Sequence, residues 1–110
     1  MPCRTGDRPF RPAAGHFDAA VPYPDLRIAE YSGIDPVNAL DVAVSGTGTG
    51  TSSSSGAVTT TNANDLLVGA NYVTTATTGA GSGFTSRVIS NPNGSILEDR
   101  AVTAVGSYSA

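Results

Sequence analysis

Apolar and polar residues alternate along most of the chain after residue 25, a period-two pattern that is typical of half-buried β-strands rather than helices. The segment 40–45 (LDVAVS) alternates most regularly, so it predicts a strand whose Leu40, Val42 and Val44 face a core. The segment 26–31 (LRIAEY) alternates in the same way and predicts a second strand.

The second half of the chain predicts more strands, separated by loops rich in glycine, serine and threonine. The segment 66–73 (LLVGANYV) is apolar on both faces, which is typical of a central strand covered on both sides. Short strands at this spacing, with no helical pattern between them, predict an all-β fold built as an antiparallel β-sandwich. The other predicted strands are 57–61, 84–90, 95–98 and 101–109.

The strongest local turn is NPNG at residues 91–94. Pro92 presets its own φ and Gly94 accepts left-handed values, so the turn should close a hairpin between the strands on either side. Glu98 and Asp99 are then expected to cap a hairpin beside Arg100 rather than to act as catalytic carboxylates.

The amount of apolar material limits the core. Leucine, isoleucine, valine and phenylalanine together number 22 of the 110 residues, which is close to the lower limit for a packed domain. The length allows one domain only. We therefore expect a single module with a thin core over residues 25–110.

Residues 1–24 differ from the rest, because they hold five of the seven prolines. Proline at this density neither donates to a sheet nor continues a helix, so a disordered leader is expected. The alternative is a basic docking arm in which Arg4, Arg8 and Arg11 bind an anionic partner.

Charge and composition exclude several classes of function. The net charge is -3 and there is no lysine, which disfavours nucleic-acid binding, and no apolar run is long enough for membrane insertion. The only histidine, His16, lies in the leader, and the only glutamates are Glu30 and Glu98. Neither a nucleophile with its base nor a facing carboxylate pair is recognisable, so an enzyme is not expected.

Two kinds of binding site remain open. Exposed tyrosines stack on sugar rings, and Tyr31 and Tyr72 are the candidates for carbohydrate binding. No cofactor is expected, with calcium as the one alternative, since loop carboxylates and amides are ligands that calcium prefers. The candidate calcium ligands are Asp35, Asn62, Asn64 and Asp65, whose side chains can instead cap their own turns.

Three stretches resemble a known kind of module: EYSG at 30–33, TTTNANDLLVG at 59–69 and GSYSA at 106–110. They are similar to a jelly-roll, concanavalin-like β-sandwich found in large secreted or surface proteins of environmental bacteria. The resemblance covers residues 21–110 and brings no catalytic residue with it. It implies an incomplete jelly roll, equivalent to the C-terminal half of such a module.

Together these observations predict a non-catalytic structural, adhesive or spacer module of an extracellular or cell-surface bacterial protein. Its partners would be neighbouring domains of a longer protein. The alternative is a carbohydrate-binding module, with polysaccharide as the ligand. Burial or exposure of the two candidate tyrosines discriminates between these functions.

Overall fold

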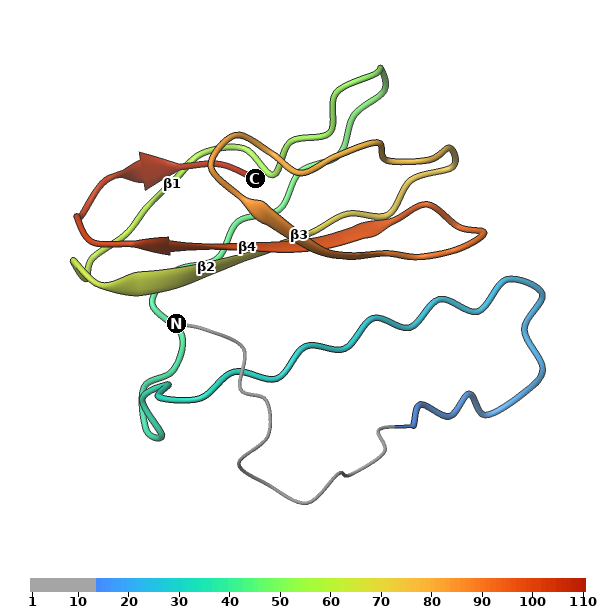
Figure 1. The fold of residues 1–110 in the computed structure, drawn as a ribbon, viewed down its shortest axis with the longest axis horizontal. Helices are drawn as coiled ribbons and strands as arrows, with labels where there is room; N and C mark the ends of the chain where they lie inside the picture. The colour runs from blue at the N-terminus through green and yellow to red at the C-terminus, as the bar shows by residue number, and fades with distance from the viewer. Residues whose placement is uncertain (1–13) are drawn as a thin grey trace.

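The computed structural model describes residues 14–110, and all regular structure in this range is β (Figure 1). Strands β2, β4 and β3 form a three-stranded antiparallel sheet in that order, while β1 and β5 pair antiparallel as a second sheet. The predicted all-β class is thus confirmed, with two antiparallel sheets. The strands are β1 (Val58–Thr59), β2 (Asp65–Ala70), β3 (Thr85–Ile89), β4 (Ile96–Val102) and β5 (Ser107–Tyr108).

The predicted hairpin at residues 91–94 is confirmed as the connection between β3 and β4. The Ser90 N–H donates to the Ser95 carbonyl at 2.9 Å, which closes the base of the turn. Gly94 has a φ of 73°, and its backbone passes so close to Ala76 that a Cβ atom would lie 2.5 Å from the Ala76 Cα. Only glycine meets both conditions.

Strand β4 is longer than predicted and runs through the position of the expected hairpin end. Glu98 and Asp99 lie in its middle and are 4% and 3% exposed, so the prediction that they cap a hairpin is wrong. Each buried carboxylate has a donor from another segment: the Gly81 N–H lies 2.8 Å from Glu98, and Arg87 binds Asp99. These partners make burial of the two charges possible.

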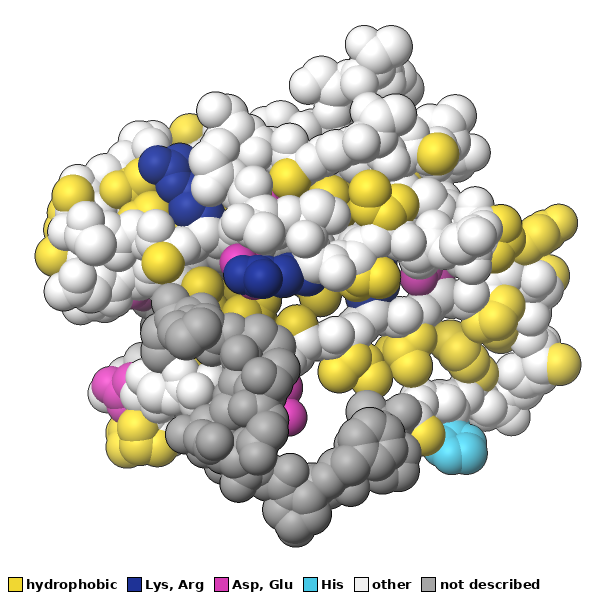
Figure 2. Space-filling model, viewed as in Figure 1, with side chains coloured by type: hydrophobic (Ala, Val, Ile, Leu, Met, Phe, Trp, Pro, Cys, Tyr) yellow, Lys and Arg dark blue, Asp and Glu magenta, His cyan; other side chains and the backbone are white. Residues whose placement is uncertain are grey.

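Strand β2 is an edge strand, so the prediction that it is central and covered on both sides is wrong. The core is as thin as the composition suggests. Within residues 14–110, Ile96 and Val102 are the only large hydrophobic side chains that are buried, and other apolar side chains lie open on the surface (Figure 2).

The segments 26–31 and 40–45 do not form the predicted strands. Residues 26–31 are extended and run along the three-stranded sheet (Figure 1), attached to it by side chains rather than by a backbone ladder. Leu40 is 75% exposed and Val44 is also exposed, so the prediction that they face a core is wrong. Val42 is partly buried.

Residues 14–24 form neither strand nor helix and are exposed. The remainder of the predicted leader, with Arg4, Arg8 and Arg11 of the predicted docking arm, lies outside the described residues.

Candidate functional site

A groove of about 410 Å³ runs along β2. All residues from 66 to 70 line it, and successive side chains of a strand point to opposite faces of the sheet. The groove therefore follows the edge of the strand and is not confined to one face of the sheet. Residues of the second sheet, Val58 and Tyr108, line it as well. The opposite wall is the segment 39–44, whose side chains are mostly aliphatic. The groove is therefore an apolar channel beside an open sheet edge.

The register of β2 shows which backbone groups point into this channel. The Asn71 N–H donates to the Ile96 carbonyl, which makes these two residues a hydrogen-bonded pair. Because such pairs alternate in an antiparallel ladder, Leu66, Val68 and Ala70 direct their N–H and C=O groups away from β4. Among residues 14–110, no backbone hydrogen bond outside the strand ladder reaches these three residues.

The channel continues at the N-terminal end of β2 into a polar pocket of about 490 Å³. The two cavities share a wall that includes Leu40, Val42 and Leu66. All four residues predicted as calcium ligands line this pocket, so the structure brings them into one place. They are Asp35, Asn62, Asn64 and Asp65.

Asp41 also lines the pocket and was not predicted as a site residue. Its carboxylate accepts hydrogen bonds from the Thr61 hydroxyl and from the Thr61 N–H, the latter at 2.7 Å. Asp41 lies 24 residues before its partner Asp65, and its place in an alternating segment predicts only an outward-facing residue. No local pattern could have identified it.

Asp41 and Asp65 form a close carboxylate pair with opposite pKa shifts. Hydrogen bonds from Thr61 hold the pKa of Asp41 below its usual value. Burial raises the pKa of Asp65, and its hydrogen bond to Asp41 and the charge of Asp41 raise it further. The Oδ2 atom of Asp65 is buried and has no donor among residues 14–110. The pocket therefore holds more negative charge than its own donors compensate.

The ability of this pocket to hold a metal is limited. Asp35 caps its own turn, accepting hydrogen bonds from the N–H groups of Val37 at 2.8 Å and Asn38 at 3.1 Å. In the part of the chain that the structure describes, no group of three or more His, Cys, Asp or Glu side chains is placed to hold a metal ion. Asp41 and Asp65 are the side chains that would bind a cation first.

The two candidate tyrosines have different environments. Tyr31 is partly buried and its hydroxyl donates to Asp99 at 2.6 Å, whereas Tyr72 is 81% exposed. Asp99 pairs with Val68, and Tyr72 lies four residues further along the chain, about 13 Å at the rise of a strand. The structure therefore does not join Tyr31 and Tyr72 into one aromatic platform. Tyr23, also 81% exposed, is the other open tyrosine near this end of the sheet.

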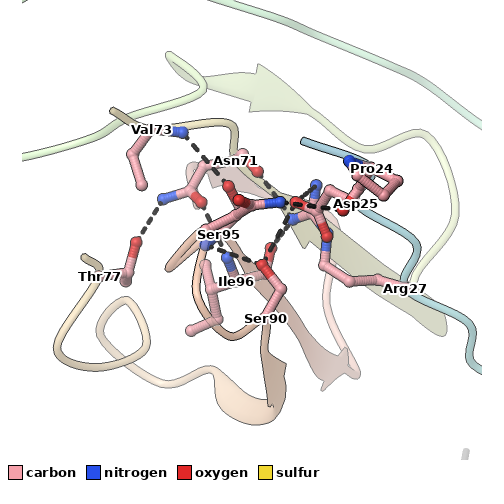
Figure 3. Close-up of polar contacts among 10 residues, drawn as sticks. Pro24, Asp25, Arg27, Asn71, Val73, Thr77, Ser90, Ser95 and Ile96 are labelled. Carbon is pink, nitrogen blue, oxygen red and sulfur yellow. Dashed lines mark hydrogen bonds and ion pairs between the residues drawn. The ribbon is translucent and has the colours of Figure 1, made fainter. Parts of the chain in front are cut away.

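A polar network fastens the extended segment to the end of the three-stranded sheet (Figure 3). Arg27 Nη1 donates to the carbonyl oxygens of Asn71 and Ile96, at 2.7 Å each. Asp25 lies 3.7 Å from the Arg27 guanidinium and accepts a hydrogen bond from the Ser90 hydroxyl at 3.2 Å. Side-chain donors and acceptors of the extended segment thus bind residues more than 40 positions away in the sequence.

Within residues 14–110, no helix has the length and apolar character that crossing a membrane requires. Comparisons with models of protein families, with curated proteins and with solved structures find no match for this chain.

Proposed function

We propose that this chain is a non-catalytic structural or spacer module of an extracellular or cell-surface bacterial protein, built as a jelly-roll-type sandwich. The observation that carries the proposal is that two buried carboxylates of β4, Glu98 and Asp99, accept hydrogen bonds from distant segments. Asp99 accepts two hydrogen bonds from Arg87, at 2.7 and 2.8 Å, and a third from Tyr31. Glu98 accepts a hydrogen bond from the Gly81 N–H. These carboxylates connect three separate segments to the central strand.

Such connections are what a small module with little apolar core requires. Long-range polar contacts take the place of buried aliphatic side chains in holding the segments together, and both carboxylates accept such contacts. The exposed loops of glycine, serine and threonine and the absence of lysine suit an extracellular setting. The resemblance of residues 21–110 to modules of secreted bacterial proteins supports the same setting.

The experiment that tests this function is single-molecule stretching of the full chain between two folded reporter domains. A structural or spacer module resists extension and then unfolds in one cooperative step. The Asp99→Ala variant should unfold at lower force, because it removes the link between β4 and the segments that hold Arg87 and Tyr31. Extension without any force peak contradicts the proposal.

The second candidate is carbohydrate binding, which the exposure of Tyr72 and Tyr23 favours. Open tyrosine rings can stack on sugar faces. Binding of the chain to a polysaccharide panel, with loss of binding in Tyr72→Ala and retention in Tyr108→Phe, would support it. Equal binding by all three proteins would contradict a site at Tyr72.

A further inference from the structure

We propose that the open edge of β2 accepts an extended peptide strand of alternating apolar residues with one arginine or lysine at its C-terminal end. This inference rests on the proposed structural function, since it names how the module joins a neighbouring segment of protein. The occupant is a strand from a partner, held by backbone hydrogen bonds along β2 and by a cation in the acidic pocket.

The backbone of β2 supplies the first argument. Leu66, Val68 and Ala70 each direct one N–H and one C=O away from β4, and these groups alternate at the spacing of a strand. An added strand pairs with all of them at once, which is the physical basis of peptide recognition by sheet edges. Val68, in the middle of this edge, is 54% exposed.

The walls of the groove supply the second argument. Its volume of about 410 Å³ lies within the ordinary range of ligand pockets. Val42 and Val44 line one side and Leu67 and Tyr108 the other. The apolar side chains of an alternating strand share one face, so they would contact the aliphatic wall on that face of the groove.

Charge complementarity supplies the third argument and decides the chemistry of the strand end. Residues 14–110 contain eight carboxylate side chains and three arginines. Each arginine is engaged elsewhere: Arg27 lies near Asp25, Arg87 binds Asp99, and Arg100 stacks over a tyrosine ring at 5.3 Å. No arginine of residues 14–110 is engaged with the Asp41 and Asp65 pair, so a cation from a partner would be the complementary group.

An antiparallel orientation brings the charged end of the added strand to the acidic pocket. A strand antiparallel to β2 runs from Ala70 toward Asp65, so its C-terminal residue arrives at the acidic pocket. A basic residue at that position can approach the Asp65 Oδ2 atom, which has no donor within the described residues. The expected partner sequence therefore alternates apolar and polar residues and ends in arginine or lysine.

The test is amide hydrogen exchange of the full chain, followed by NMR, with and without the peptide acetyl-Thr-Val-Thr-Val-Thr-Val-Arg-amide. In the free chain the amides of Leu66, Val68 and Ala70 should exchange at least about tenfold faster than those of Leu67 and Gly69, which bond to β4. Saturating peptide should slow the three fast amides. Protection of these amides in the free chain, by its own segment 39–44 or by a second copy, overturns the proposal, as does the absence of slowing by peptide.

Matched peptides and variants separate the two parts of the site. A peptide with proline in place of the middle valine lacks a backbone donor and should not bind. Asp65→Asn should weaken the arginine peptide roughly fivefold and leave a glutamine-ended peptide unchanged. Val68→Pro should abolish binding, whereas Ser86→Pro, on the free edge of β3, should not. Equal binding of arginine-ended and glutamate-ended peptides overturns the assignment of the cation.

This test is independent of the stretching experiment. A chain that unfolds cooperatively under force but binds no peptide refutes strand addition and leaves the structural function standing. A chain that binds peptide but extends without a force peak refutes the spacer function instead.

Discussion

The cluster around Asp99 provides the sharpest test of how this thin-cored chain is stabilised. Asp99→Ala removes a 3% exposed carboxylate and leaves Arg87 and Tyr31 without their shared acceptor. A hydrogen bond to a charged group contributes about 1.5–3 kcal/mol when buried, but Arg87 is 38% exposed and can rehydrate, so its two bonds together count for about 1–2 kcal/mol. The Tyr31 hydroxyl adds about 1 kcal/mol, which gives a total of about 3 kcal/mol.

Urea unfolding followed by circular dichroism measures this loss. For a chain of this size about 3 kcal/mol corresponds to a fall of roughly 15 °C in Tm. Asp18→Ala, at an exposed position of the same chain, is the matched control and should change the free energy of unfolding by less than about 0.5 kcal/mol. If Asp99→Ala behaves like this control, the view that polar links replace the missing core is refuted.

The pH dependence of the same variant gives a second readout. Hydrogen bonds from Arg87, and then from Tyr31, hold the pKa of Asp99 below its ordinary value of 3.8. A carboxyl with a lowered pKa in the folded state stabilises the fold above the unfolded-state pKa and loses that effect as the pH falls through the folded-state pKa. The stability difference between Asp99→Ala and the unmodified chain should therefore be constant at neutral pH and narrow only below pH 3.8.

Three further results are expected. Asp65→Asn should raise Tm at pH 7, because burial and the neighbouring Asp41 raise the pKa of Asp65 and so make its charged form unfavourable in the fold. The gain should disappear as the pH falls toward 3.8, and a lower Tm at pH 7 would contradict the carboxylate pairing. Gly94→Ala should cost about 2 kcal/mol or more in urea unfolding, because of its positive φ and the approach of Ala76, and a cost below about 0.5 kcal/mol would contradict the turn geometry. Addition of calcium or of EDTA should leave Tm unchanged within about 1 °C, since only Asp41 and Asp65 meet as carboxylates; a rise in Tm with calcium would establish a metal site there instead.

Local chemistry was sufficient to predict the all-β class and the hairpin between β3 and β4. The turn at residues 91–94 depends on the φ values that Pro92 and Gly94 accept, and these are properties of single residues. The predicted loop at 46–56 has no apolar residue, and it contains no strand in the structure. All its residues are exposed except Ser55, which is partly buried. Features of this kind require no knowledge of what the rest of the chain does.

The candidate site was predictable in part. The four candidate calcium ligands do line one pocket, because three of them are close together in the sequence and the fourth belongs to a turn beside them. Asp41 escaped prediction, since its contact with Thr61 depends on how two distant segments meet. The different environments of Tyr31 and Tyr72 also depend on contacts between distant segments, because the Tyr31 hydroxyl donates to Asp99, which lies 68 residues away.

The sequence by itself determined the type of local structure, because alternation and turn residues act over a few positions. Tertiary structure decided where strands end and which residues are buried. From the sequence, Glu98 and Asp99 are expected at the surface. They can be buried inside β4 because the Gly81 N–H and the Arg87 side chain donate hydrogen bonds to them. The segment 40–45 has the pattern of a strand but lies beside an edge it does not pair with, since pairing requires a partner at the correct distance as well as a suitable pattern.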